Sequence, residues 1–560
     1  KGLDVAMVVK IRIGDKVYNI DVADRYFSEL ISYLHNAGLK YDPNSKTWTG
    51  DGLYAEPPRE LLDNVPGLRQ LKWFSGRYKG NYFVYCGKEP THLTYTLTTY
   101  KRVSCEEYCD EKAEYDYYSC VDACEEEGWN TVLKKTETVR LYWPDDKRPG
   151  CWHVPRGLVH RIVGANPPYF VKQLDSVDFG DASKLRDYQR DVVNSIFAAF
   201  TRYGGAIAQM ATGAGKSYMA GYIAKKLINA GYTVYMTALG VDLITQLKEF
   251  AAMHGVDVNK VKAVTIQKLY RKLTGKDIER HELREAYGED EVYVEEEDSN
   301  NIEIDIKERN VAVIIDEVHH VPARTVKEVV KAFGDGWALR LGLSATPWRN
   351  DGRDLEVEAW VGPIVEPRIT SSYLVERGFL VPAEIHFLRP PSCGYDDDNN
   401  WAAVRRLLAK CEKRNKFIAD IVAKAPKPVL VLTPLVSHAE LLHEMIQGSE
   451  VATGKVSPTQ RKEIFDKVRR GELDVLIATT IANEGLDLPP LRAMVNALGG
   501  KSKTLTLQRV GRIVRPWPGK DKAIVYDLCD NVKYFSDHCR EREKLYKTEP
   551  AWKIVQASRI

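Results

Sequence analysis

The chain has 560 residues, too many for one hydrophobic core, so its length predicts roughly three or four domains. Its composition, 44% hydrophobic and 28% charged, is that of a globular protein, and no apolar run reaches the length of about 18 residues that a membrane span needs. The N-terminus shows no signal-peptide pattern, and we therefore expect an intracellular protein that has no membrane partner.

The net charge of +2 conceals a strong local asymmetry. Residues 105–127 carry ten acids and one base, and residues 282–309 carry twelve acids and three bases. Each stretch contributes −9, so the rest of the chain carries +20. A basic frame suits a polyanionic partner, because Lys and Arg displace the counterions that condense on phosphates. Solvated helix faces are the alternative explanation for such charge runs.

The first part of the chain is predicted to be a mixed α+β domain over residues 1–175, which would recognise nucleic acid or another substrate. Two alternating runs at 7–13 and 16–22 flank Gly14-Asp15, which is a hairpin signal. A helix should follow, because five apolar residues share one helical face. These are Tyr26, Phe27, Leu30, Ile31 and Leu34. Further strands are expected at residues 45–49, 82–85, 93–100 and 131–141.

A cysteine-rich insertion is expected within this domain, at about residues 101–128. Cys105 and Cys109 form one pair at helical i, i+4 spacing, and Cys120 and Cys124 form another, so the four could meet across a helical hairpin. A zinc ion held by four thiolates fits an intracellular chain. Two disulfides are the rival, since cytosolic proteins keep disulfides mainly in hyperthermophiles. Free buried cysteines are the third alternative.

From about residue 183, short apolar runs alternate with helical segments, which is typical of parallel α/β domains. One domain is predicted over residues 176–380 and a second over residues 381–560. Because open parallel sheets bind ligands at the carboxyl ends of their strands, the polar motifs that follow these runs are candidate sites. The expected strands are 206–209, 233–237, 263–266, 311–315, 339–343, 429–432, 475–478, 493–496 and 523–526.

A glycine-rich loop, Ala211-Thr212-Gly213-Ala214-Gly215-Lys216-Ser217, lies between an apolar strand and a helical segment. In this setting the backbone N–H groups point at phosphates. Gly213 and Gly215 would let the backbone approach the phosphates, Lys216 would reach the terminal phosphates, and Ser217 would hold Mg²⁺. The full pattern begins with Gly, but Met210 occupies that position here. A Gly-rich turn without phosphate binding is the alternative.

The second chemical motif is Asp316-Glu317-Val318-His319, directly after the run 311–315. Asp316 would hold Mg²⁺, and Glu317 would orient or deprotonate the attacking water, so that metal and base are supplied together. The alternative is an acid pair that caps the next helix. The distance of about 100 residues from the glycine-rich loop favours the catalytic interpretation.

With these two motifs, the chain resembles the DExH-box helicases of superfamily 2, and the resemblance covers about residues 183–530. It implies two tandem RecA-like lobes, ATP and Mg²⁺ as cofactors, and movement along nucleic acid from 3′ to 5′. The other strings that carry the resemblance stand in the expected order. They are Leu185-Arg186-Asp187-Tyr188-Gln189, residues 237–246, Val264-Thr265-Ile266-Gln267, Ser344-Ala345-Thr346, Leu432-Thr433-Pro434, Ala452-Thr453-Gly454, residues 477–487, and Gln508-Arg509-Val510-Gly511-Arg512-Ile513-Val514-Arg515.

The resemblance also implies roles for single residues. Gln189 would read adenine through its side-chain amide, Thr212 and Ala214 would bind nucleotide with the rest of the loop, and Arg512 and Arg515 would act as arginine fingers on the γ-phosphate. Four further assignments follow from the family motifs. Gln508 would face the γ-phosphate, Gly485 and Asp487 would couple the second lobe to the nucleotide, His319, Ser344 and Thr346 would couple hydrolysis to movement, and Thr237, Thr265, Thr433 and Thr479 would contact nucleic-acid phosphates.

The string from Gly342 to Gly352, followed by Glu376-Arg377-Gly378-Phe379-Leu380-Val381-Pro382, is similar to DNA-repair translocases of the TFIIH type and to phage recombination helicases. That similarity favours single-stranded or branched duplex DNA as the partner. An RNA helicase, a motor subunit of a defence or restriction complex, and an ATP-switched scaffold are the alternatives. The N-terminal domain and the acidic insertion at 282–309 are the candidate surfaces for a protein partner; a solvated insertion is the alternative for the latter.

Overall fold

The computed structural model describes residues 6–112, 120–121, 124–125, 131–171, 174, 184–239, 241–279, 281–283, 302–345, 352–394, 401–479, 488–497, 499, 503–532 and 535–555. The chain divides into two compact units, Lys1–Pro168 and Tyr169–Ile560. The predicted division into three domains stays a prediction. None of the helices among the described residues combines the length and hydropathy that a membrane crossing requires.

The first sheet of unit 1 has the strand order β2-β1-β4-β3, and its first two strands form the predicted hairpin. Gly14 sits in that turn with a φ of 58°, which a Gly adopts without strain. Leu30, Tyr33 and Leu34 of the helix α1 pack into the core beneath the sheet. The elements are β1 (Ala6–Ile13), β2 (Lys16–Ala23), α1 (Asp24–Asn36), β3 (Lys40–Asp42), β4 (Thr47–Gly50) and α2 (Arg59–Asn64).

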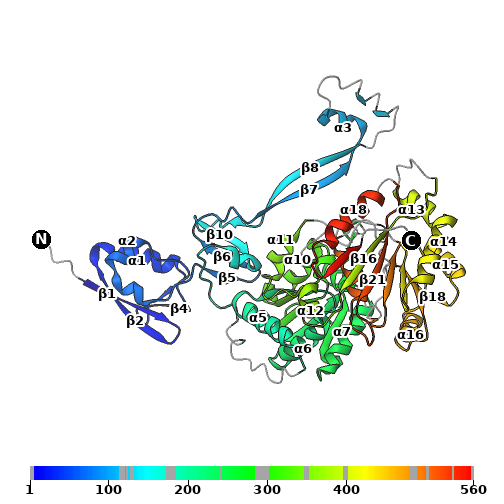
Figure 1. Cartoon of the computed structure of the whole chain (residues 1–560). Helices are drawn as coiled ribbons and strands as arrows, with labels where there is room; N and C mark the ends of the chain where they lie inside the picture. Colours follow the sequence, from blue (N-terminus) through cyan, green and yellow to red (C-terminus); the bar gives the residue numbers. More distant parts are fainter. Residues whose placement is uncertain are drawn as a thin grey trace. The chain divides into compact units, whose positions relative to one another are not determined.

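The second sheet of unit 1 has the order β5-β6-β10-β9, and a separate two-stranded ribbon, β7-β8, extends from the same region (Figure 1). A disulfide joins Cys86 on β6 to Cys151 on the paired strand β10. The elements are β5 (Gly76–Lys79), β6 (Tyr82–Cys86), β7 (Thr94–Arg102), α3 (Cys105–Lys112), β8 (Val132–Arg140), β9 (Trp143–Pro144) and β10 (Cys151–Pro155).

The first lobe of unit 2 is a five-stranded parallel sheet in the order β11-β15-β14-β12-β13, with helices packed against it. Every residue of β14 is buried, as expected of a strand covered on both faces. The elements are α5 (Asp187–Tyr203), β11 (Gly205–Gln209), α6 (Lys216–Asn229), β12 (Thr233–Ala238), α7 (Val241–Met253), β13 (Val261–Thr265), α8 (Ile266–Thr274), β14 (Val311–Ile315), α10 (Ala323–Ala332), β15 (Leu339–Ser344) and α11 (Asp354–Val361).

The second lobe is a seven-stranded parallel sheet in the order β18-β19-β17-β20-β21-β16-β22. Its elements are α12 (Ser371–Glu376), β16 (Ala383–Leu388), α13 (Trp401–Lys410), α14 (Glu412–Lys424), β17 (Val429–Leu432), α15 (Val436–Met445), β18 (Ser449–Ala452), α16 (Pro458–Arg469), β19 (Val475–Ala478), β20 (Ala493–Asn496), α17 (Lys503–Ile513), β21 (Ala523–Leu528), α18 (Phe535–Tyr546) and β22 (Trp552–Val555). The predicted fold class, two parallel-sheet lobes after a mixed α+β domain, is confirmed. All ten cysteines are paired, which the sequence did not settle.

Candidate nucleotide-binding site

The glycine-rich loop connects β11 to α6 at the carboxyl edge of the first-lobe sheet. Gly213 and Gly215 have φ values of 95° and 78°, which other residues rarely adopt. A Cβ at Gly215 would lie 2.6 Å from Gln189 Nε2, and one at Gly213 would lie 2.8 Å from Leu380 Cδ2. Gly215 is also the N-cap of α6, so the loop leads directly into a helix N-terminus that favours anions. Both glycines are therefore favoured by their positive φ values, and a Cβ at either position would also require a neighbouring side-chain end to shift.

Met210 stands where the full loop pattern has Gly, and the structure shows why the loop accepts it. Its side chain is fully buried. Its backbone forms a bridge with Ile369, and its N–H donates to Ser344 O at 2.8 Å. Met210 therefore belongs to the sheet edge and leaves the phosphate-facing part of the loop unaltered.

Four side chains from the two predicted motifs converge beside this loop. Ser217 Oγ donates to Asp316 Oδ2 at 2.9 Å, and Lys216 Nζ lies 3.6 Å from Glu317 Oε1. Lys216 and Asp316 are buried, while Glu317 keeps 17% of its side chain exposed. The sequence separates the two motifs by about 100 residues. They meet because β11 and β14 flank β15 in the same parallel sheet, so that their carboxyl ends lie at the same edge.

The electrostatics of Asp316 follow from its burial. The pKa of its carboxyl is raised to about 6, mainly because the group is buried and secondly because the Glu317 carboxylate lies beside it. Lys216 and the hydrogen bond from Ser217 oppose this rise. Ser217 Oγ and an Asp316 oxygen face each other, and hydroxyl and carboxylate oxygens are ligands that Mg²⁺ prefers. The donor set therefore fits the cation that accompanies a nucleotide.

Glu317 adopts a left-handed backbone conformation with φ 47° and ψ 46°. Its N–H donates to Asp316 Oδ1 at 2.9 Å, which contributes to holding this turn. His319 Nδ1 lies 3.6 Å from Glu317 Oε2 and 2.9 Å from Ser344 Oγ. The predicted coupling residue His319 thus lies between Ser344, to which it is hydrogen-bonded, and the candidate base Glu317. Thr346 lies outside the described residues.

Gln189 is buried against the loop, and both the nitrogen and the oxygen of its side-chain amide form hydrogen bonds. Nε2 donates to Ala214 O at 2.9 Å, and Oε1 accepts the N–H of Arg186 at 2.9 Å. Tyr188 OH also donates to Ala214 O at 2.9 Å. Gln189 therefore stabilises the glycine-rich loop through its hydrogen bond to Ala214 O. Recognition of adenine by Gln189 stays a prediction.

Aromatic and cationic side chains next to Gln189 were not singled out from the sequence. The Arg186 guanidinium stacks over Phe379 at 4.4 Å, and Tyr188 meets the same ring edge-on at 5.3 Å. Phe379 follows α12 on the segment that leads into the second lobe, as does Leu380, which lies against Gly213. The strings containing these residues were visible, but which side chains meet depends on tertiary contacts.

The second lobe reaches the loop through the segment around α17. Arg515 Nη1 donates to Gly213 O at 3.1 Å, and a Cβ at Gly511 would lie 2.6 Å from Thr212 Cβ. Arg515 therefore contacts the glycine-rich loop, and its role as an arginine finger stays a prediction. Arg512 lies in α17, one turn before it. Gly485, Asp487 and the side chain of Gln508 fall outside the described residues.

The four predicted nucleic-acid threonines all lie at carboxyl ends of strands and are all buried. Thr265 Oγ1 caps α8 by accepting the N–H of Lys268, and Thr433 Oγ1 lies 2.7 Å from His438 Nδ1. The hydroxyls of Thr237 and Thr479 have no hydrogen-bond partner among the residues that the structure describes. Phosphate contact by any of the four stays a prediction.

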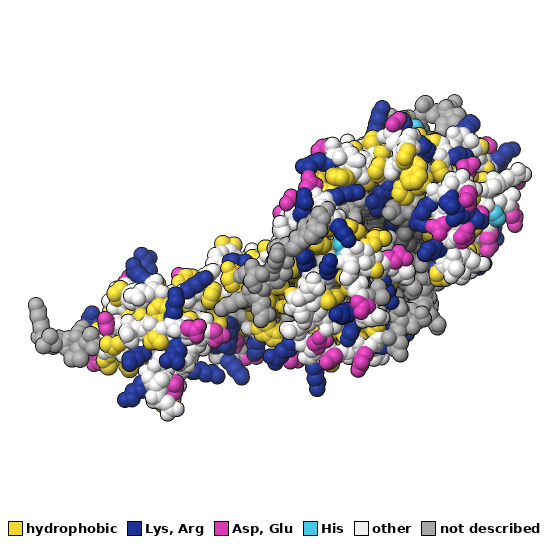
Figure 2. All heavy atoms as spheres, turned by 90° about the horizontal axis from the view of Figure 1, so that it is seen from below, with side chains coloured by type: hydrophobic (Ala, Val, Ile, Leu, Met, Phe, Trp, Pro, Cys, Tyr) yellow, Lys and Arg dark blue, Asp and Glu magenta, His cyan; other side chains and the backbone are white. Residues whose placement is uncertain are grey.

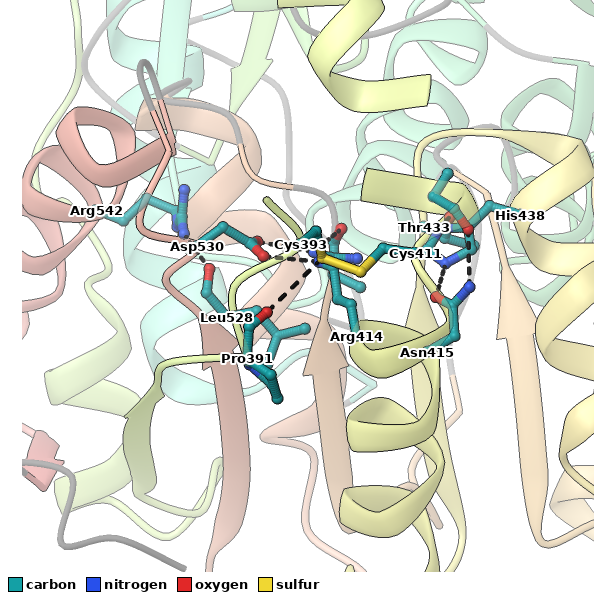
Figure 3. A network of polar contacts seen from close by, with 12 residues as sticks. Pro391, Cys393, Cys411, Arg414, Asn415, Thr433, His438, Leu528, Asp530 and Arg542 are labelled. Atoms are coloured by element: carbon teal, nitrogen blue, oxygen red, sulfur yellow. Dashed lines mark hydrogen bonds and ion pairs between the residues drawn. A yellow bond between two sulfur atoms is a disulfide. The ribbon is translucent and has the colours of Figure 1, made fainter. Parts of the chain in front are cut away.

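A buried polar network fixes the end of β17 in the second lobe (Figure 3). His438 Nε2 lies 2.8 Å from Asn415 Oδ1, and Asn415 Nδ2 donates to Ala409 O at 2.8 Å. Asn415 Oδ1 must therefore accept, so His438 carries its proton on Nε2 and the Thr433 hydroxyl donates to Nδ1. Burial lowers the pKa of His438 to about 3, which agrees with a neutral ring. The hydroxyl proton of Thr433 is thus donated to His438 Nδ1, so in this structure it is not donated to another group.

The same helix, α14, ties two further strand ends together (Figure 3). Arg414 donates to Asp530 through Nε at 2.8 Å and Nη2 at 2.9 Å, and to Ala497 O at 3.3 Å. A disulfide joins Cys411, directly before α14, to Cys393. Sequence reasoning missed this network, because its members are ordinary polar residues until the fold buries them.

The four cysteines of the N-terminal insertion form two disulfides, Cys105–Cys124 and Cys109–Cys120. The structure therefore contains the disulfide alternative and not the four-thiolate zinc site. Asp527, Cys529 and Cys539 lie close enough together to share an ion. However, the two sulfurs are bonded to each other, and Asp527 accepts from buried Arg542 and Tyr546. These three residues are consequently not a zinc site in this state.

Two family models match the chain, and both matches lie in unit 2. The model described as type III restriction enzyme, res subunit, matches residues 182–349. The model described as helicase conserved C-terminal domain matches residues 412–516. The first range contains the glycine-rich loop and Asp316-Glu317, and the second contains the segment that places Arg515 at the loop.

Three relatives illustrate the similarity. A proposed helicase of Sulfolobus islandicus filamentous virus is 28% identical, covering 63% of this chain and 65% of that protein. A proposed DNA 3′-5′ helicase Rad25 of Halobacterium salinarum is 29% identical, covering 42% of this chain and 39% of that protein. The DNA 3′-5′ translocase XPB2 of Sulfurisphaera tokodaii is 25% identical, covering 62% of this chain and 82% of that protein. The chain thus spans less than two thirds of the first two relatives.

Proposed function

Because the chain is a member of helicase superfamily 2, related to TFIIH-type translocases, we propose that it is an ATP-dependent DNA helicase or double-strand translocase that moves 3′ to 5′. The observation that carries the proposal is the convergence of Lys216, Ser217, Asp316 and Glu317 beside the glycine-rich loop, with Arg515 of the second lobe donating to Gly213. A site completed by both lobes makes hydrolysis depend on how the lobes meet.

The proposed chemistry divides among these side chains. Lys216 would bind the terminal phosphates, and Ser217 and Asp316 would hold Mg²⁺, which would supply positive charge that neutralises the phosphates. Glu317 accepts the proton of the attacking water, and Arg515 donates its guanidinium to the charge that develops on the γ-phosphate. His319 connects Glu317 to Ser344 at the end of β15, so a shift at the base is passed to the sheet edge.

DNA is proposed as the substrate, in repair, recombination or replication. Support comes from the string at residues 342–352 and from relatives named as DNA 3′-5′ helicases or translocases. A relative in Acanthamoeba polyphaga mimivirus is named for RNA, so RNA is the competing substrate. Hydroxyl and backbone contacts to phosphates would make stepping independent of sequence.

The test compares ATP hydrolysis with single-stranded DNA, duplex DNA, RNA and no nucleic acid, alongside displacement of a labelled strand from substrates with 3′ or 5′ tails. DNA-stimulated hydrolysis with displacement or translocation from the 3′ tail is expected. Stronger stimulation by RNA would move the protein to the RNA helicases. Hydrolysis that no nucleic acid alters would reject a motor and leave an ATP-switched scaffold.

A further inference from the structure

The two-stranded ribbon of unit 1 has two different faces. Strands β7 and β8 pair antiparallel over nine residue pairs, from Thr94 opposite Arg140 to Arg102 opposite Val132. Because side chains alternate across a strand, residues at even positions of both strands share one face. The opposite face includes Leu97 and Leu133, which are largely buried.

The even-numbered face is polar and open. Two cross-strand pairs of threonines occupy its centre, Thr96 with Thr138 and Thr98 with Thr136, and all four are exposed. Arg140 stands at its base end, and Lys134 stands two residues from its tip end; both are exposed. Neither cation forms an ion pair with a carboxylate among the described residues. They are six residues apart on β8, which corresponds to roughly 20 Å.

The charge of the ribbon favours a polyanion. The strands carry Lys101, Arg102, Lys134, Lys135 and Arg140 against the single acid Glu137, a net charge of +4 over 18 residues. The acidic run 105–127 follows at the tip. Thr136 stands four residues after Val132, the residue of β8 nearest the tip, and this separation of roughly 13 Å exceeds the screening length of about 8 Å at physiological salt. The acidic residues of the run 105–127 therefore have little effect on the positive electrostatic potential at the centre of the ribbon.

The ribbon is also fixed in shape before any partner arrives. At the tip end, Val103 N–H donates to Thr131 O at 3.0 Å, and the two disulfides Cys105–Cys124 and Cys109–Cys120 close the segment beyond. At the base, Leu141 N–H donates to Leu93 O at 3.0 Å. A preformed ribbon loses little conformational entropy on binding, which favours affinity.

We propose that the even-numbered face of the β7–β8 ribbon binds duplex DNA in the major groove, with the threonine hydroxyls at base edges and with Lys134 and Arg140 on backbone phosphates. The major groove is about 12 Å wide and admits a two-stranded ribbon, whereas the minor groove, about 6 Å wide, does not. Threonine hydroxyls both donate and accept, so the face tolerates different sequences. The choice of DNA rests on the proposed function, but the site is separate from both lobes.

Charge is seen on the surface of both units, since Lys and Arg side chains are spread over the face shown in Figure 2. A test must therefore separate this face of the ribbon from the general basic surface. The full-length chain with Lys134→Ala and Arg140→Ala is compared with a control that carries Lys135→Ala and Lys147→Ala. Both variants lose two positive charges from exposed positions of unit 1, but Lys135 projects from the opposite face of β8 and Lys147 lies outside the ribbon.

Affinity for a 30-base-pair duplex is measured by fluorescence anisotropy between 50 and 200 mM salt. The Lys134/Arg140 variant is expected to bind on the order of tenfold more weakly, with a log–log salt slope smaller by about 1.8, because two phosphate contacts are lost. The control should stay within about twofold of the unmodified chain. Equal losses in both variants would overturn the proposal, and so would no loss in the first. The melting temperature of each variant verifies folding.

A second measurement locates the contact. The variant Thr136→p-benzoylphenylalanine is irradiated with labelled duplex DNA, single-stranded DNA or duplex RNA. Crosslinking to duplex DNA above the other two is expected, and crosslinking to single strands or RNA alone would overturn the proposal. Stimulation of ATP hydrolysis in the unmodified chain is scored separately, so a failure of the ribbon leaves the proposed motor function intact, and a failure of the motor function is recognised on its own.

Discussion

At the scale of single residues, Glu317 is the position where conformation and chemistry are most closely joined. It is a non-glycine residue at φ 47°, a region that costs on the order of 1 kcal/mol or more. The turn directs its carboxylate to within 3.6 Å of both Lys216 Nζ and His319 Nδ1. Strain of this kind persists when the surroundings hold it and is typical of functional sites.

Substitutions at Lys216 and Glu317 should separate nucleotide binding from hydrolysis. Glu317→Gln is expected to bind ATP but to lower kcat by about 10²–10⁴-fold, because the amide cannot accept the proton of water. Lys216→Ala should weaken ATP binding and also abolish turnover. Equilibrium binding of a fluorescent ATP analogue and single-turnover hydrolysis measure the two steps. Normal turnover in Glu317→Gln would refute its role as base.

At the scale of elements, helix α14 fastens the carboxyl ends of three parallel strands. Asn415 reaches β17 through His438 and Thr433, and Arg414 reaches the ends of β20 and β21 through Ala497 O and Asp530. Carboxyl ends of parallel strands are where such sheets bind ligands. The network therefore helps to position the loops that follow these three strands.

The neutral, buried His438 makes a specific prediction for pH. Its pKa falls from 6.5 to about 3 on folding, so the unfolded chain takes up a proton below pH 6.5 that the folded chain does not. The free energy of unfolding should therefore decrease as pH falls from 6.5 toward 3, by roughly 1.4 kcal/mol per pH unit from this residue. The free energy of unfolding of His438→Gln, measured by denaturant titration at several pH values, should depend less steeply on pH. The difference in slope should correspond to the one proton that His438 takes up on unfolding. Identical pH profiles would contradict the assignment.

At the scale of the whole molecule, five disulfides are distributed over both units. Cys86–Cys151, Cys105–Cys124 and Cys109–Cys120 lie in unit 1, and Cys393–Cys411 and Cys529–Cys539 lie in unit 2. Complete pairing of the cysteines is unusual for proteins of the reducing interior of ordinary cells and is typical of intracellular proteins of hyperthermophiles. The five disulfides would thus persist and stabilise the folded state.

Removing one disulfide should measurably lower the free energy of unfolding. Cys393→Ser with Cys411→Ser opens a link between residues 18 apart and is expected to lower the free energy of unfolding by about 3 kcal/mol, and Tm by roughly 6–12 °C. Calorimetry with and without reductant measures the change, and under reducing conditions variant and parent should approach each other. Thiol counting on the denatured, unreduced chain should find no free thiols. Free thiols together with bound zinc would restore the zinc alternative at Cys105, Cys109, Cys120 and Cys124.

The sequence by itself determined the central strands and the two motifs of the nucleotide site. The runs 311–315, 429–432, 475–478 and 493–496 coincide with β14, β17, β19 and β20, because strands buried on both faces of a parallel sheet must be continuously apolar. The glycine-rich loop and Asp316-Glu317 could be recognised for a similar reason, since their chemistry is encoded in adjacent residues.

Only the tertiary structure decided the edges, the cysteine partners and the buried polar network. Strand β16 contains Glu384 and His386 and lies next to the edge strand β22, so it lacks the apolar run of an interior strand. Cys86 and Cys151 are 65 residues apart, and Arg414 and Asp530 are separated by 116. Such pairs are set by how sheets and helices pack over long sequence distances, and no local pattern specifies which of many polar or thiol side chains will meet.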